Sequence, residues 1–183
     1  MTGRPAPNEA APYYSTYIDR ITSYDVLATL ELRSARQNTA LKRESQLDPT
    51  LRLLANITEE KSLHRYAPDK WSIRELLNHI SDNERVFLYR ALWFARGFDT
   101  PLPGFDQNIA VPHAAANQYS WASHIADFSA VRTATLTFFR NLPDEAWSRT
   151  GIASGNPVSV RALAYIIAGH VAHHIAILEE RYL

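Results

Sequence analysis

The chain has 183 residues, 46% of them hydrophobic, which is enough for one domain with a substantial buried core. Lys and Arg total 19, as do Asp and Glu, so the net charge is zero and gives no general support for binding nucleic acid or an anionic membrane. The absence of Cys excludes disulfides, thiolate nucleophiles and cysteine-based zinc sites.

The N-terminus is rich in Pro and Ala and lacks the continuous apolar run of a secretory signal. We expect residues 1–15 to form a loose N-terminal arm on a single domain that spans residues 1–183. No segment is expected to reach the roughly 18 charge-poor apolar residues of a membrane-spanning helix. The closest, residues 162–178, carries three histidines. The chain is therefore expected to be cytoplasmic, with no membrane partner.

Helical structure is expected before residue 70. Residues 24–45 are rich in helix formers and end in polar residues. Asp48-Pro49 then indicates a new start, with Asp48 as N-cap and Pro49 in the first helical position. The sequence leaves open whether this region forms one kinked helix or two.

A stronger start signal follows at Ser72. Ser72 and Glu75 have the spacing of a capping box, and Gly97 is a natural stop, so a helix is predicted from Ser72 to about Arg96. Its apolar positions recur at helical spacing: Ile73, Leu76, Ile80, Phe87, Ala91 and Phe94.

A long irregular connection is expected between residues 98 and 119, where Pro and Gly are frequent. Connections of this length are uncommon unless they are functional or disordered. We expect residues 101–117 to form part of a pocket mouth, with Asp106 and Gln107 near a substrate. The alternative is that the loop caps the far end of the bundle, with Phe105 plugging the core.

Two further helices complete the prediction. One runs from about Trp121 to Leu142, where Pro143 follows, and the other begins at Ser159 and continues almost to the C-terminus. The segment GIASGNP between them is expected to be an irregular loop, and no run is typical of a β-strand. The pattern therefore predicts an all-α fold.

The last helix carries histidines on its apolar face. On a helical wheel His174 lies at the middle of the apolar arc, His170 lies within it, and His173 lies at its edge. Two imidazoles one turn apart can bind one metal ion, as in H-E-x-x-H helices. Position 171 is Val, so the glutamate of that metalloprotease motif is missing.

A third ligand is available in the helix that follows Ser72. His79 lies on the flank of its apolar stripe and can face a neighbouring helix. Three imidazoles suit zinc, nickel, iron or copper, and they leave a coordination position for water or substrate. The alternative is that these histidines are hydrogen-bonded core residues. The remaining histidines, His64, His113 and His124, are expected to be solvated.

Three segments of the chain resemble the DinB/YfiT-like family of metal-dependent hydrolases and thiol transferases: RYAPDKWSIRELLNHISDNERVFLYRALWFARG, TPLPGFDQN and RTGIASGNPVSVRALAYIIAGHVAHHIAILEERYL. The resemblance covers residues 66–183 best. Its specific parts map to His79, His170 and His174. It implies a four-helix bundle with an unusual connection order, one divalent metal ion (zinc or nickel) and a homodimer. It also implies a small-molecule substrate, such as a low-molecular-weight thiol.

The expected activity is hydrolysis or transfer of a low-molecular-weight thiol at an open tri-histidine site. Such a site lowers the pKa of a bound water or deprotonates a bound thiol. Asn83 and Arg90 share the wheel sector of His79 and are candidate pocket residues, Arg90 either for an anionic substrate group or in an ion pair with a helix carboxylate. Glu84 is expected to be a structural partner, and no catalytic base is assigned. The alternative is a non-catalytic metal-binding or stress protein.

Overall fold

A computed structural model describes residues 3–22, 26–27 and 46–183. Apart from residues 26 and 27, the helix expected over residues 24–45 lies outside the described residues. The helices are α1 (Ser15–Ile18), α3 (Leu47–Ala55), α4 (Ile73–Ala95), α5 (Gln107–Ala114), α6 (Trp121–Arg140) and α7 (Val160–Ile177). Short turns are η1 (Pro7–Glu9), η2 (Pro12–Tyr14), η3 (Lys61–Leu63), η4 (Ala116–Gln118), η5 (Asp144–Ser148) and the π-helical η6 (Leu178–Tyr182).

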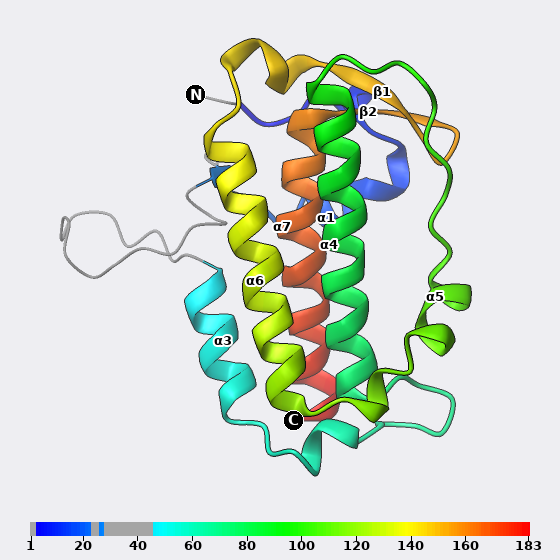
Figure 1. Cartoon of the computed structure of the whole chain (residues 1–183), viewed down its shortest axis with the longest axis vertical. Helices are drawn as coiled ribbons and strands as arrows, with labels where there is room; N and C mark the ends of the chain where they lie inside the picture. Colours follow the sequence, from blue (N-terminus) through cyan, green and yellow to red (C-terminus); the bar gives the residue numbers. More distant parts are fainter. Residues whose placement is uncertain (1–2, 23–25, 28–45) are drawn as a thin grey trace, which may run out of the picture.

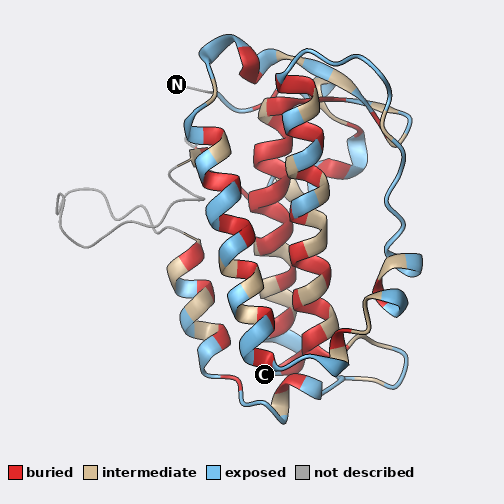
Figure 2. Ribbon diagram, in the orientation of Figure 1, coloured by how far each residue is buried: buried red, intermediate tan, exposed pale blue. Residues whose placement is uncertain are grey.

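The long helices α4, α6 and α7 run side by side, and the shorter α3 packs against α6 (Figure 1). This confirms the predicted all-α four-helix bundle. α1 lies against α7, and α5 lies beside α4. α7 is buried along most of its length (Figure 2), because neighbours surround it on several sides.

The limits of α4 follow from its terminal residues. Ser72 accepts a hydrogen bond from the Glu75 backbone N–H, and the Glu75 side chain accepts one from the Ser72 backbone N–H, as the capping box predicts. At the other end Gly97 has φ +83°, and the N–H groups of Gly97 and Phe98 donate to the carbonyls of Phe94 and Trp93. This is a Schellman motif, so both predicted ends are confirmed.

α7 and η6 together have the length and apolar composition of a membrane-spanning helix. Among the described residues, Val160–Tyr182 is long and apolar enough, with a mean hydropathy of 1.3, so the expectation that no segment qualifies is wrong. However, 67% of the apolar 18-residue stretch within this segment is buried inside the molecule. The bundle core therefore accounts for its apolar character.

Residues 151–157, expected to be an irregular loop, instead form most of a β-hairpin, so the expectation that no run is a β-strand is wrong. Strands β1 (Thr150–Ala153) and β2 (Asn156–Ser159) pair antiparallel at one end of the bundle (Figure 1). Ser154 and Gly155, with φ of +53° and +75°, join the two strands. A two-residue turn with positive φ at both positions matches the twist of paired strands, which is why this short segment forms a hairpin.

Three other expectations need correction. Residues 3–15 are not a loose arm, because Ala11 and Tyr14 are buried in the core and the Glu9 carboxylate pairs with Arg161. α3 begins at Leu47 rather than after Asp48. The connection after α4 contains α5, whose N-cap is Asp106.

Candidate metal centre

Three imidazoles from two helices meet inside the bundle. His79 comes from the second turn of α4, and His170 and His174 lie one turn apart on α7. The Nε2 atom of His170 lies 3.2 Å from that of His79 and 3.1 Å from that of His174. The three ligand atoms all lie within 4.8 Å of one another. The structure therefore brings together the three histidines that the helical wheel selected.

Burial keeps these rings neutral. It lowers the pKa of His79 to about 4 and, with smaller contributions from His79, His173 and Arg20, that of His174 to about 3. Burial, followed by the other histidines, also lowers the pKa of His170 well below its ordinary value. A neutral imidazole carries a lone pair on one ring nitrogen, which is the form that binds a metal ion.

The cluster fits a cation better than it fits a hydrogen-bonded core. The three Nε2 atoms face one another, and two such atoms in contact cannot both donate. No described residue offers a hydrogen-bond partner to the buried Nδ1 atom of His174. Within the described part of the chain, no carboxylate joins the group. A three-histidine set without a fourth protein ligand is typical of a catalytic zinc site rather than a structural one.

His173 lies outside the cluster, as the wheel predicts. Its ring packs edge-on against Tyr17, with 5.5 Å between the ring centroids, and it is half-buried. His64 and His113 are exposed, as expected. His124 is not solvated: it is buried, and one of its ring nitrogens lies 2.8 Å from the Ala116 carbonyl oxygen.

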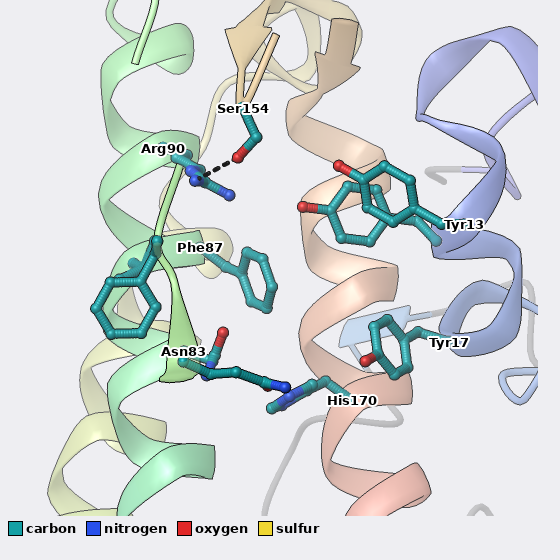
Figure 3. Close-up of a pocket in the computed structure, with 11 residues that line it drawn as sticks. Tyr13, Tyr17, Asn83, Phe87, Arg90, Ser154 and His170 are labelled. Carbon is teal, nitrogen blue, oxygen red and sulfur yellow. Dashed lines mark hydrogen bonds between the residues drawn. The ribbon is translucent and has the colours of Figure 1, made fainter. Parts of the chain in front are cut away.

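A cavity of about 250 Å³ opens beside His170 (Figure 3). One wall comes from α4 and the other from the N-terminal segment and α7. The lining residues are Tyr13, Tyr14, Tyr17, Asn83, Val86, Phe87, Arg90, Phe105, Gln107, Ser154 and His170. A second cavity, of about 290 Å³, includes His174, Trp71 and Tyr182 in its lining. The histidine cluster can thus be reached from two sides.

The four candidate pocket residues lie in different settings. Asn83 and Arg90 line the first cavity, and the Asn83 amide nitrogen lies 3.0 Å from Nδ1 of His79. Gln107 also lines this cavity. Asp106 does not: its carboxylate caps α5 by accepting a hydrogen bond from the Asn108 N–H at 2.8 Å. Glu84 pairs with Arg132 and is a structural partner, as expected.

Sequence reasoning missed the aromatic wall of the cavity. Tyr13, Tyr14 and Tyr17 come from the segment that was expected to be a loose arm or to lie next to it. Their spacing of one and four residues places aromatic rings on one side of a helical turn, and this signal was available. Ser154, which reaches the cavity from the hairpin turn, carried no such signal.

Comparison with known proteins agrees with this geometry. A family model described as the DinB superfamily matches residues 43–178. Among solved structures, the chain is similar to YfiT from Bacillus subtilis, with a TM-score of 0.67 and 14% sequence identity, covering 96% of this chain and 89% of that one. YfiT is described as a probable metal-dependent hydrolase with an unusual four-helix bundle topology. No curated protein matches the sequence.

Proposed function

We propose that this chain, which belongs to the DinB superfamily, is an enzyme that acts on a small molecule at a divalent metal ion held by His79, His170 and His174. The observation that carries the proposal is the meeting of three neutral Nε2 atoms at one point beside a cavity. YfiT's description as a metal-dependent hydrolase supports it. We propose zinc or nickel as the ion, one per chain, because both accept imidazole ligands.

The ion, when bound, supplies Lewis acidity, which polarises an electrophile and lowers the pKa of a water or a thiol. The protein's own residues orient the ligands and enclose the cavity. Asn83 contacts the His79 ring and holds its orientation. The rings of Tyr17 and Phe87 pack edge-on against His170, with centroids 5.2 and 5.9 Å away, and limit water around it. Phe105 and Gln107 complete the cavity from the connection before α5 and its first residue.

Two reactions suit this arrangement: hydrolysis, and transfer of a low-molecular-weight thiol to an electrophile. Both need the same Lewis acid and an enclosed cavity, and they differ in the nucleophile. YfiT's description favours hydrolysis, whereas the sequence resemblance also includes thiol transferases. We propose hydrolase or thiol transferase as the activity, and a soluble cytoplasmic setting for it.

Metal content tests the proposal directly. Protein purified without a metal-affinity tag is expected to contain about one zinc or nickel ion per chain by elemental analysis. The His170→Ala and His174→Ala variants are expected to contain little or none. His113→Ala is the matched control, because His113 is exposed and outside the cluster, and it should retain the metal. Wild-type protein that binds no divalent ion would overturn the proposal.

Activity is tested with a screen of esters, amides and thiol–electrophile pairs, with and without a chelator. Turnover that is lost with the chelator and restored by metal supports the enzyme. A full metal site without turnover of any pair would instead favour a metal-binding protein that is not catalytic.

A further inference from the structure

Three arginines are buried among the described residues, and they differ in their partners. Arg74 is 5% exposed, Arg90 4% and Arg132 0%. Arg74 pairs with Glu59, and Arg132 pairs with Glu84. For Arg90, no carboxylate in the described part of the chain lies within ion-pair distance. Arg90 is therefore the exception, and it is the one that lines the cavity beside His170.

The groups around Arg90 are neutral. Its Nη2 donates to the Pro103 carbonyl oxygen at 2.9 Å and to the Ser154 hydroxyl at 3.0 Å. Its guanidinium also lies 5.9 Å from the centroid of the Phe87 ring. The Tyr14 phenol is close by, and burial raises its pKa while Arg90 opposes that rise, so it is a neutral neighbour as well.

These contacts fix the guanidinium but leave part of it free. The hydrogen bonds to Pro103 and Ser154 both use Nη2, and in Figure 3 another nitrogen of Arg90 points into the cavity, towards the tyrosine rings. Arginine does not lose its proton in proteins. A buried charge without a counter-ion is costly, and a ligand anion in the cavity would relieve that cost.

The lining of the cavity also indicates which class of anion it would bind. Among the described residues that line it, Arg90 is the one cationic side chain, so a monoanion matches it better than a phosphate dianion. The planar fork of a guanidinium fits a carboxylate. Between Arg90 and His170 the wall is apolar and aromatic, with Val86, Phe87 and Tyr14. The Phe87 ring lies between the two ends, with its centroid 5.9 Å from the Arg90 guanidinium and 5.9 Å from the centroid of the His170 ring, so these groups are at most about 12 Å apart.

We propose that Arg90 binds the carboxylate of the substrate, a small organic acid with an apolar middle and a reacting group within about 12 Å, at the histidine cluster. This inference rests on the proposed function for the identity of the reacting end. The anion site itself depends only on Arg90 and the cavity.

A matched pair of ligands tests the inference by calorimetry on metal-loaded protein. The probes are ω-mercaptohexanoate and ω-mercaptohexanol, which share a thiol and a chain and differ in the carboxylate. Wild-type protein should bind the acid about 10- to 100-fold more tightly than the alcohol, the range for a charge-assisted hydrogen bond. In Arg90→Gln this preference should fall to about twofold or less, with the affinity for the alcohol unchanged.

Two variants control for misfolding. Arg90→Lys keeps the charge without the fork and should retain part of the preference. Arg96→Gln, an exposed arginine at the end of the same helix, should retain all of it. Equal binding of acid and alcohol by wild-type protein, a comparison that needs no variant, would overturn the inference. So would an unchanged preference in a folded Arg90→Gln.

A second pair, hexanoate and hexanol, separates this inference from the proposed function. It is measured by NMR on chelator-treated protein, where no metal can bind the carboxylate. Preference for hexanoate that depends on Arg90, in a protein that binds no divalent ion, would uphold the anion site and overturn the metal site. A normal metal content without Arg90-dependent binding of either acid would do the reverse.

Discussion

Arg132 and Glu84 show how this bundle holds a charged pair in its interior. Arg132 Nε and Nη2 donate to the two carboxylate oxygens of Glu84 at 2.8 and 2.7 Å, and Nη1 donates to the Gln46 side chain at 2.9 Å. The pair joins α4 to α6, with side chains that are 0% and 2% exposed. Such a pair adds little net stability over apolar residues, but losing one partner leaves a buried charge.

Replacing Glu84 by Gln should therefore lower the free energy of unfolding by about 3–5 kcal/mol, measured by urea denaturation. The matched control is Asp82→Asn on the same helix, where the carboxylate pairs with the exposed Arg85. Because surface pairs contribute little, that change should cost about 1 kcal/mol or less. Equal effects of the two substitutions would contradict the assigned role of the buried pair.

The histidines should make the metal-free protein acid-sensitive. The pKa of His79 is lowered to about 4 and that of His174 to about 3, both by burial, from an ordinary value near 6.5. As pH falls below about 6.5 the unfolded chain takes up protons that the folded chain does not, so the free energy of unfolding falls with pH. Urea unfolding of chelated protein between about pH 7 and pH 5, above the carboxylate range, measures this.

The His79→Gln variant has one fewer histidine with a lowered pKa, so its loss of stability over that interval should be smaller. His113→Ala should keep the full loss, since His113 is exposed. A wild-type stability that stays flat over this interval would show that the rings are not buried as neutral groups.

At the scale of elements, Gly169 sets how closely α1 approaches α7. A Cβ built at Gly169 would lie 2.0 Å from the Tyr17 carbonyl oxygen, which is backbone and cannot rotate away. This close approach brings Tyr17 against the His170 ring. One glycine on α7 thus positions the aromatic wall of the cavity.

Gly169→Ala should push α1 away and lower the free energy of unfolding by about 1–3 kcal/mol, the usual cost of overpacking. Gly104→Ala is the control, because its new Cβ would meet the Ser154 hydroxyl at 3.7 Å, an ordinary contact. Limited proteolysis should cut the N-terminal segment faster in Gly169→Ala than in the control. Identical cleavage and stability in both variants would mean that the α1–α7 contact is not tight.

At the scale of the whole molecule, the expected homodimer needs a surface other than α7. The apolar side chains of α7 cannot form it, because this helix is buried within the bundle. Exposed apolar side chains lie instead near the end of α4, where Tyr89 is 49%, Leu92 39% and Phe98 51% exposed. The Trp93 ring stacks on Phe98 with centroids 4.1 Å apart, and adjoining exposed apolar groups of this kind favour an interface.

We expect light scattering at tens of micromolar to give twice the chain mass, and Leu92→Glu to give the monomer. The control is Leu63→Glu, an exposed leucine in η3 and outside this surface, which should leave the dimer intact. A monomeric wild-type protein at that concentration would contradict the expected homodimer.

Local sequence by itself determined the long helices and the burial of the three clustered histidines. The Ser72–Glu75 box and Gly97 act within one helical turn, so the limits of α4 could be predicted from neighbouring residues alone. The wheel separated His174 from His173 for the same reason, since the period of a helix is a local property.

Tertiary structure alone decided the pocket. The Ser159 hydroxyl bonds to Glu9 across 150 positions of sequence, and Arg90 to Ser154 across 64. No periodicity within a segment encodes contacts between such distant residues. The spacing of the tyrosines could indicate a shared face, but the cavity that this face lines could not be derived from it, nor could the lack of a carboxylate partner for Arg90 among the described residues. Asp106, in contrast, has a role that neighbouring residues explain. Its carboxylate caps α5, which begins at the next residue, and this contact keeps the carboxylate out of the cavity. Side chains become a site only where the folded chain brings them together and leaves their polar groups unpaired.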